Sequence, residues 1–170
     1  MTDTLKLIVD KLSQYNFLTN IIPGSVLCII FEYIVGLDIM PNSAYQAGIV
    51  FYFAGLVNGR FSSMFIEWLL VRKLKWIKFA PYSDFVEAEK TDSKITTLSR
   101  ENNTYRAYIS VCFLSILCWV YRLITDCPDV KVIVGVSLLL LSLLVLFVLS
   151  YRKQTNYVRR RVEKVISSSH

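Results

Sequence analysis

Polar and ionisable side chains lie inside the hydrophobic segments of this 170-residue chain, where they have the clearest chemical meaning. Burying charge in hydrocarbon is expensive, so such residues mark a function or a tight protein contact. The set comprises Glu32, Asn58, Arg60, Ser63, Glu67 and Arg122. Their types allow ion pairing between helices, the lining of a water-filled path, or proton transfer at a carboxylate.

Residue patterns for catalysis or metal binding are missing from the sequence. The only histidine is the terminal His170, which excludes His-based nucleophilic and metal sites. There is no Gly-rich phosphate loop, zinc spacing or Ser–His pairing. The cysteines, Cys28, Cys112, Cys118 and Cys127, show no metal-ligand spacing, and we interpret them as small packing residues. We therefore expect a protein that is not an enzyme and has no catalytic residues, metal or cofactor.

Hydropathy predicts the elements that carry these residues. Hydrophobic residues make up 54% of the chain and the mean hydropathy is +0.46, well above a soluble domain. Four apolar segments, 17–37, 44–71, 105–123 and 130–151, reach the length of about 20 residues that crosses a bilayer. We predict an all-α integral membrane protein, a four-helix bundle with additional amphipathic helices outside the bilayer.

The distribution of Lys and Arg predicts the orientation. Sixteen of the 19 basic residues flank the two termini and the long connection between the second and third spans. The positive-inside rule places these segments in the cytoplasm, which agrees with an even number of spans. We expect a bacterial inner-membrane location, with both termini cytoplasmic and the basic flanks in contact with anionic headgroups.

The chain divides into five predicted segments. They are a cytoplasmic amphipathic helix (1–16), a transmembrane hairpin (17–71), a cytoplasmic helical loop (72–104), a second hairpin (105–151) and a basic cytoplasmic tail (152–170). The tail extends the fourth helix and carries an apolar stripe, Val158, Val162, Val165 and Ile166. We interpret the tail either as a stop-transfer flank that binds anionic lipid headgroups or as a helix that packs against another copy of the chain or a cytoplasmic partner. We do not expect direct nucleic-acid binding, because a basic tail alone is unspecific.

Small residues on the second span predict an oligomer interface. One helical stripe comprises Gly48, Gly55, Gly59 and Ser62. Gly55 and Gly59 form a small-xxx-small pair, which lets helix backbones approach closely. The stripe lies beside the one that carries Arg60, Ser63 and Glu67. We therefore expect a homo-oligomer with a partly polar interface.

Depth in the bilayer limits which charges can pair. Glu32 and Arg122 both fall in the outer half, so an ion pair between them is geometrically feasible. Arg60 and Glu67 fall in the inner half of the bilayer. We expect them to interact either along their own helix or between copies of the chain. Three interpretations follow: buried pairs that set helix register, a water-filled path lined by Arg60, Ser63 and Glu67, and a proton-coupled site at Glu32.

The middle loop and the tail carry the residues expected to contact a partner protein or lipid headgroups. These are Tyr82, Asp84, Phe85, Asn102, Asn103, Tyr105, Arg106, Arg159, Arg160 and Arg161. In size, topology and the loop that contains Tyr105 and Arg106, the chain resembles the small four-pass membrane subunits of bacterial anti-phage defence systems. Among these systems we name the Kiwa type first. The resemblance implies a role in such a defence system.

Three functions are compatible with these features. The first is an oligomeric inner-membrane sensor or scaffold that recruits or regulates a cytoplasmic partner protein. The second is a pore or membrane-depolarising effector with Arg60 and Glu67 on an axial path. The third is a small proton-coupled transporter that uses Glu32, although the long charged loop departs from the compact multidrug-type family.

Overall fold

The computed structural model describes residues 16–126 and 128–169, and all regular elements in these ranges are helical. In chain order they are η1 (Phe17–Ile21), α3 (Ile22–Ile30), η2 (Phe31–Val35), α4 (Ala44–Phe61), η3 (Ser62–Ile66), η4 (Trp68–Lys73), α5 (Tyr82–Thr91), α6 (Ser93–Asp126) and α7 (Val130–Ser169), where η marks a π-helical segment. The amphipathic helix predicted for residues 1–16 lies outside the described residues, apart from residue 16.

Four helices are long and apolar enough to cross a membrane. They are Phe17–Val35, Ala44–Lys73, Ser93–Asp126 and Val130–Ser168. The all-helical fold with four such helices, as expected of an integral membrane protein, is confirmed. The apolar stretches of these four helices are called spans one to four.

Local residue chemistry explains where the first two spans end and begin. Gly36 follows η2 in the left-handed conformation, with φ of 78°, which a residue without a Cβ adopts at no steric cost. The Ser43 hydroxyl then caps α4 by accepting a hydrogen bond from the backbone N–H of Gln46 at 3.3 Å. The connection between these caps is short, so spans one and two are neighbours.

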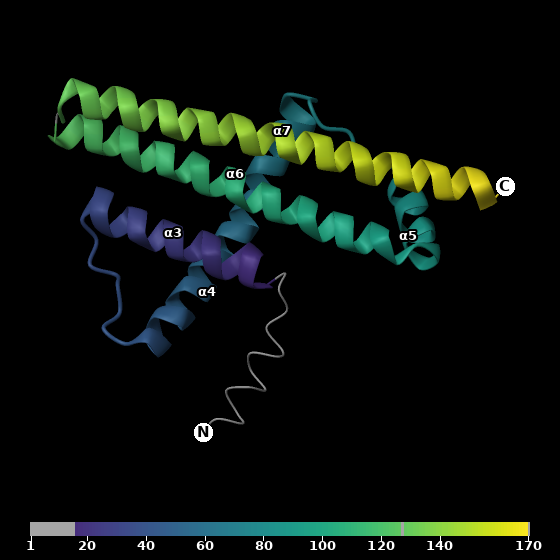
Figure 1. The fold of residues 1–170 in the computed structure, drawn as a ribbon, viewed down its shortest axis with the longest axis horizontal. Helices are drawn as coiled ribbons and strands as arrows, with labels where there is room; N and C mark the ends of the chain where they lie inside the picture. The colour runs from purple at the N-terminus through teal and green to yellow at the C-terminus, as the bar shows by residue number, and fades with distance from the viewer. Residues whose placement is uncertain (1–15, 127, 170) are drawn as a thin grey trace.

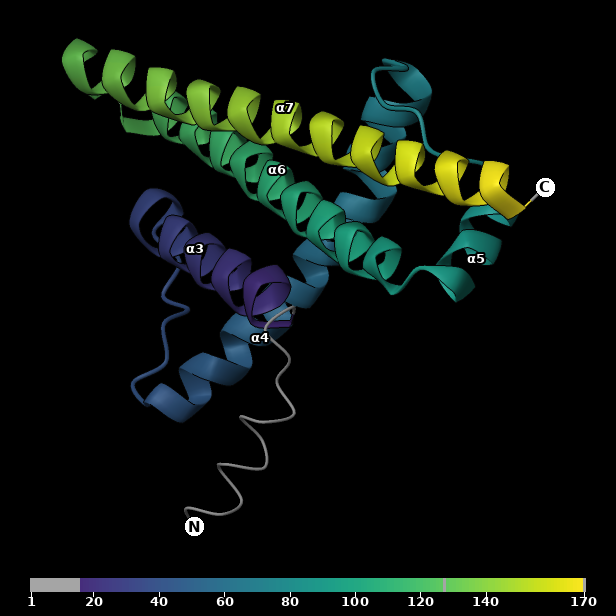
Figure 2. The same cartoon turned by 45° about the vertical axis from the view of Figure 1, so that its right-hand side comes forward.

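The helices do not all run side by side. In Figures 1 and 2, α6 and α7 lie antiparallel along the longest axis, with α3 beside α6, whereas α4 and its π-helical continuation cross the others obliquely. The near-parallel packing typical of four-helix bundles therefore describes only part of the molecule. The oblique second span has contacts with both span one and span three.

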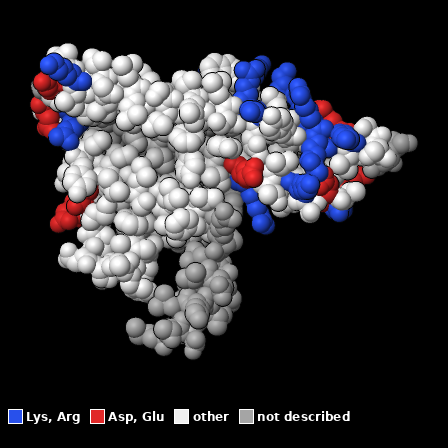
Figure 3. Space-filling model, viewed as in Figure 1, with Lys and Arg blue, Asp and Glu red and all other residues white. Residues whose placement is uncertain are grey.

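Charged residues gather at the two ends of the molecule. Figure 3 shows an uncharged middle zone, with Lys and Arg concentrated over the end formed by α5 and the C-terminal half of α7. The uncharged zone includes an exposed face of α7 built from Leu138, Leu141, Val145, Leu146 and Leu149. Such a face suits a lipid environment, where exposed apolar side chains cost nothing.

The basic end has a packed core of its own. We call it the helical platform; it consists of α5, residues 93–104 of α6 and residues 152–169 of α7. Its buried core residues are Ala88, Ile95, Val158 and Val162, with Phe85, Leu98, Val165 and Ile166 packed around them. The apolar stripe predicted for the tail is therefore covered by the chain's own helices.

The predicted segment boundaries at 104/105 and 151/152 fall inside continuous helices. Residues 93–104 and span three form one helix, α6, and the tail and span four form another, α7. The end of the predicted helical loop, 72–104, thus shares a helix with span three, because no helix-ending residue interrupts the chain there. Platform and membrane spans are thus joined by two unbroken helices.

Candidate functional site

Buried polar side chains connect spans two and three. Asn58 is 1% exposed; its Nδ2 donates to the Ala107 carbonyl at 3.1 Å, and its Oδ1 accepts from the Ser110 hydroxyl at 2.6 Å. Donor and acceptor of the amide are therefore both used, which removes most of the penalty for burying it. Asn58 lies at a helix contact inside one chain.

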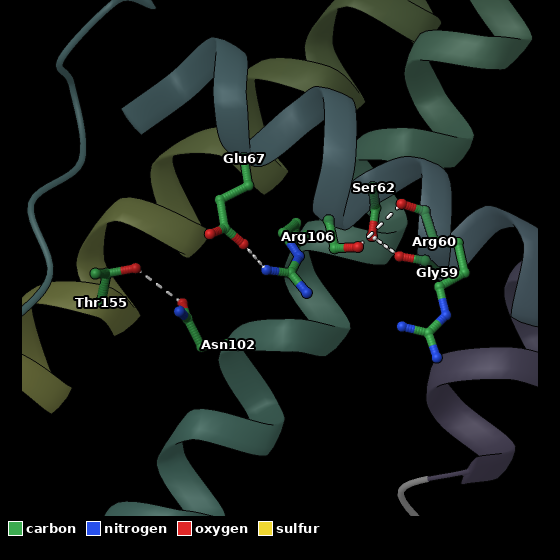
Figure 4. A network of polar contacts seen from close by, with 8 residues as sticks. Gly59, Arg60, Ser62, Glu67, Asn102, Arg106 and Thr155 are labelled. Atoms are coloured by element: carbon green, nitrogen blue, oxygen red, sulfur yellow. Dashed lines mark hydrogen bonds and ion pairs between the residues drawn. The ribbon is translucent and has the colours of Figure 1, made fainter. Parts of the chain in front are cut away.

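An ion pair between Glu67 and Arg106 continues this connection, as Figure 4 shows. The Arg106 side chain is 15% exposed and that of Glu67 is 35% exposed, so the pair is partly shielded from solvent. The fully buried Tyr151 of α7 lies close to both charges. Among the described residues, neither Arg106 Nε nor the Tyr151 hydroxyl completes a hydrogen bond. Glu67 thus pairs across helices rather than with Arg60 on its own helix.

A second polar layer joins α6 to α7 at the platform. Asn102 Oδ1 accepts a hydrogen bond from the Thr155 hydroxyl at 3.0 Å (Figure 4). Gln154 Nε2 donates to Glu101 Oε2 at 2.8 Å and to the Leu98 carbonyl at 3.3 Å. Because hydrogen-bonding groups tolerate little displacement, these contacts set the register of the two long helices.

The platform is also held by an ion pair between Asp92, which lies between α5 and α6, and Arg161 of α7. The hydrogen bond from Arg161 holds the pKa of Asp92 below its ordinary value, an effect that desolvation partly opposes and the Lys94 backbone N–H supports. Arg161, expected to contact a partner or lipid, therefore ties the tail to the rest of the platform.

The small-residue stripe is divided between internal and open positions. A Cβ on Gly55 would lie 1.9 Å from the Asn20 carbonyl oxygen, and one on Gly24 would lie 1.8 Å from the Phe51 carbonyl oxygen. These glycines let spans one and two of the same chain touch through their backbones. At Gly48 and Gly59 a Cβ would meet nothing within 4 Å. Ser62 is buried and donates to the Gly59 carbonyl at 2.9 Å.

Glu32 and Arg122 lie near one another but use other partners. The Glu32 carboxylate accepts backbone hydrogen bonds from Ile39 at 3.3 Å and Met40 at 3.0 Å, which fixes the connection after span one. Arg122 pairs with Asp126 at 3.3 Å and donates to the Tyr33 carbonyl at 2.8 Å. The Glu32–Arg122 pair considered from depth alone is not formed.

Of the other residues predicted to contact a partner protein or lipid, some pack in the interior of the protein and others lie on its surface. Tyr105 packs against the central hydrophobic cluster with Ile66, Leu70, Ile109 and Tyr151, and Phe85 packs into the platform core. Tyr82 is 82% exposed, and Asp84 accepts from the Ser83 hydroxyl at 3.0 Å. Arg159 pairs with Glu163 at 3.5 Å.

Arg160 contributes to an exposed basic hollow on α7. Its volume is about 330 Å³, and it is lined by Leu149, Arg152, Lys153, Asn156, Tyr157 and Arg160. The Lys153 ammonium lies 5.8 Å from the centre of the Tyr157 ring, a weak cation–π contact. This face of α7 points away from the buried stripe of Val158 and Val162.

Sequence reasoning missed Ser110, Tyr151, Gln154 and Thr155. A usable signal exists in the spacing of Tyr151, Thr155, Val158 and Val162, which places them on one helical stripe. Since the stripe mixes polar and apolar residues, hydropathy alone does not mark it as buried. In the structure this stripe is buried at all its positions, Tyr151, Thr155, Val158 and Val162.

Among the described residues, no group of three or more His, Cys, Asp or Glu side chains is arranged to hold a metal ion. No protein-family model, curated protein or solved structure matches this chain. The function must therefore be inferred from the site geometry itself.

Proposed function

We propose that this protein is an oligomeric membrane scaffold of the sensor type, which recruits or regulates a cytoplasmic partner protein on its helical platform. One observation carries the proposal: the platform has its own buried core, centred on Ala88, Ile95 and Val162. A simple stop-transfer flank requires only exposed basic residues and no core. Ordering a segment costs about 1–2 kcal/mol per residue in backbone entropy, so a fixed surface outside the spans calls for a use.

The charge distribution supports a cytoplasmic location for the platform. Its exposed residues include Lys90, Lys94, Arg152, Lys153 and Arg160, and the positive-inside rule assigns such a concentration to the cytoplasmic side. A bacterial inner membrane is the proposed setting, with anti-phage defence as the proposed context.

Mechanical continuity supports the sensor role. Since α6 and α7 run unbroken from the membrane zone into the platform, a tilt or shift of spans three and four moves the platform surface with them. The Asn102–Thr155 and Gln154–Glu101 hydrogen bonds keep the two helices in register during such a movement. A change in the membrane or in oligomer contacts is thereby transmitted to the docking surface.

Affinity purification tests the proposal. Tagged full-length protein, expressed with its neighbouring genes and crosslinked in the membrane, should recover one abundant cytoplasmic protein. Charge-reversed platform variants, Lys90→Glu and Lys94→Glu, should lose at least about 90% of that recovery, equivalent to tenfold weaker binding. Leu141→Ala, on the lipid-suited face of α7, is the matched control and should retain it. Recovery of the membrane protein alone would contradict the scaffold function.

Liposome leakage separates the scaffold from a pore. The scaffold predicts that reconstituted protein leaves potassium and chloride gradients intact. A leak that is present in the unmodified protein and altered by Arg60→Ala would favour the pore instead. Glu32→Gln provides the equivalent comparison for proton flux and the transporter.

A further inference from the structure

A polar hollow lies between the first three spans. Its volume is about 250 Å³, and its polar lining comes from Thr19, Asn20, Arg60, Ser62, Ser63, Asn103 and Arg106. It has room for several waters, or for one small polar group. Figure 4 shows the Arg60 side chain reaching from span two toward the first helix, with Arg106 on the neighbouring helix.

The hollow lies at the level where spans one and three enter the apolar zone. Thr19 and Asn20 are in η1, at the start of span one, and the Thr19 hydroxyl lies 3.0 Å from that of Thr104 on α6. Asn103 and Arg106 flank the start of the apolar run of span three. Because α4 crosses these helices obliquely, it brings Arg60 from the middle of its own span to the same level.

The lining carries positive charge and unused hydrogen-bonding groups. Within the described part of the chain, the side chains of Asn20, Arg60 and Asn103 form no hydrogen bond or ion pair, and Arg106 Nε is buried without a partner. The lining contains no carboxylate; Glu67 lies outside it and is engaged with Arg106. A buried donor without a partner, such as Arg106 Nε, and an arginine within a membrane span, such as Arg60, are both costly unless a polar ligand satisfies them.

We propose that this hollow binds a phosphate group. Arginine is the residue best suited to phosphate, since its planar guanidinium donates two parallel hydrogen bonds, and the amides of Asn20 and Asn103 supply further donors. Basic pockets between spans on the cytoplasmic side are suited to phospholipid headgroups. A lipid phosphodiester and a soluble phosphate ester share this chemistry. Asn103 is the only lining residue of the hollow that belongs to the helical platform, and the hollow lies away from Lys90 and Lys94, so the site stands or falls independently of the scaffold function.

Native mass spectrometry of the full chain in detergent tests the site, with phosphatidylglycerol, phosphatidylcholine and inorganic phosphate as probes. Phosphatidylglycerol should bind in preference to zwitterionic phosphatidylcholine. Arg60→Gln removes one charge from an exposed position without disturbing the Glu67–Arg106 pair, and should weaken phosphatidylglycerol binding about tenfold. Arg152→Gln, in the exposed hollow on α7, is the matched control and should leave this binding unchanged.

Each outcome of the mass spectrometry experiment either supports or overturns the phosphate site. Unchanged affinity in Arg60→Gln, equal loss in Arg152→Gln, or equal binding of both lipids overturns the site. Displacement of phosphatidylglycerol by millimolar inorganic phosphate, with the same dependence on Arg60, supports a site for a soluble phosphate ester. Lack of displacement, with the Arg60 dependence retained, supports a site for a lipid headgroup.

Discussion

Glu67 and Arg106 show how single residues resolve the problem of charge inside this molecule. Either charge alone would carry a large desolvation free energy inside the molecule. The two residues are 39 positions apart in the sequence, but their side chains form an ion pair, so the charges partly neutralise one another. Asn58 uses the same solution with hydrogen bonds, since Ala107 and Ser110 satisfy its amide. Arg60 is the exception, because no partner for its guanidinium exists in the described part of the chain. It is therefore the residue most suited to an external ligand.

Removing one member of the ion pair should be worse than removing both. Glu67→Leu leaves Arg106 unpaired and should destabilise the protein by about 2 kcal/mol; a fully buried pair would cost about 3–5 kcal/mol, and the exposure of Glu67 lowers this value. The double variant Glu67→Leu/Arg106→Leu should recover most of the loss. Denaturant titration in mixed micelles measures both. A double variant less stable than either single one would contradict a simple pair.

The Asp92–Arg161 pair makes platform stability depend on pH in acid. Because the folded pKa of Asp92 is lowered, its contribution is complete above the ordinary aspartate pKa of about 3.9 and is lost as the pH falls from there through the folded pKa. Asp92→Asn should lower the thermal midpoint by a few °C at most at pH 7 and remove this acid dependence. Glu87→Gln, exposed on α5, is the control. An unchanged acid profile in Asp92→Asn would contradict the assignment.

At the scale of elements, the second span has two different surfaces. Gly55 faces span one so closely that their backbones touch, whereas Gly48 and Gly59 face open space. A small-residue stripe thus serves a contact inside the chain and leaves part of its length for another copy. The oblique course of α4 follows from this close crossing, since larger residues would hold the helices apart.

Alanine substitutions should separate these surfaces. Gly55→Ala places a methyl group against the Asn20 backbone and should cost about 1–3 kcal/mol through overpacking. Gly48→Ala meets no atom and should be neutral or gain up to about 1 kcal/mol from helix propensity. Thermal unfolding in detergent measures the difference. If Gly48→Ala lowers the oligomer mass without changing protomer stability, the open surface is the interface between copies.

The platform should unfold separately from the spans when its core is weakened. Val162→Ala removes two methyl groups from a fully buried position and should destabilise the platform by about 1.5–3 kcal/mol. Hydrogen exchange should then rise in α5 and residues 93–104, with little change in the apolar zone. Val145→Ala, on the exposed face of α7, serves as the comparison. A uniform rise across all helices would contradict an independent platform core.

For the whole molecule, the orientation is the property on which the proposed function depends. The platform reaches a cytoplasmic partner only if the basic end faces the cytoplasm. A fluorescent-protein fusion after residue 170 should therefore be bright, and alkaline phosphatase inserted at residues 128–129 should be active on the opposite side. The reverse pattern would exclude cytoplasmic docking on the platform while leaving the helix packing unaffected.

The amino-acid sequence by itself determined the four apolar helices. Each span is a local property, because a run of about 20 apolar residues must form a helix to satisfy its backbone groups in hydrocarbon. Caps are local as well, as Gly36 and Ser43 show. Of the site, the sequence named Asn58, Arg60, Glu67 and Arg106, because polar residues in or beside apolar runs are conspicuous.

Only the tertiary structure decided what those residues contact. Pairing depends on helix crossing angles and register, which arise from side-chain packing between segments tens of residues apart. The close approach at Gly55 tilts span two, and this tilt carries Arg60 to the level of Asn20 and Asn103. The same packing assigned Glu67 to Arg106 and covered the apolar stripe of the tail with α5 and α6. Depth counted along one helix cannot reveal these contacts, because it treats every span as perpendicular to the membrane.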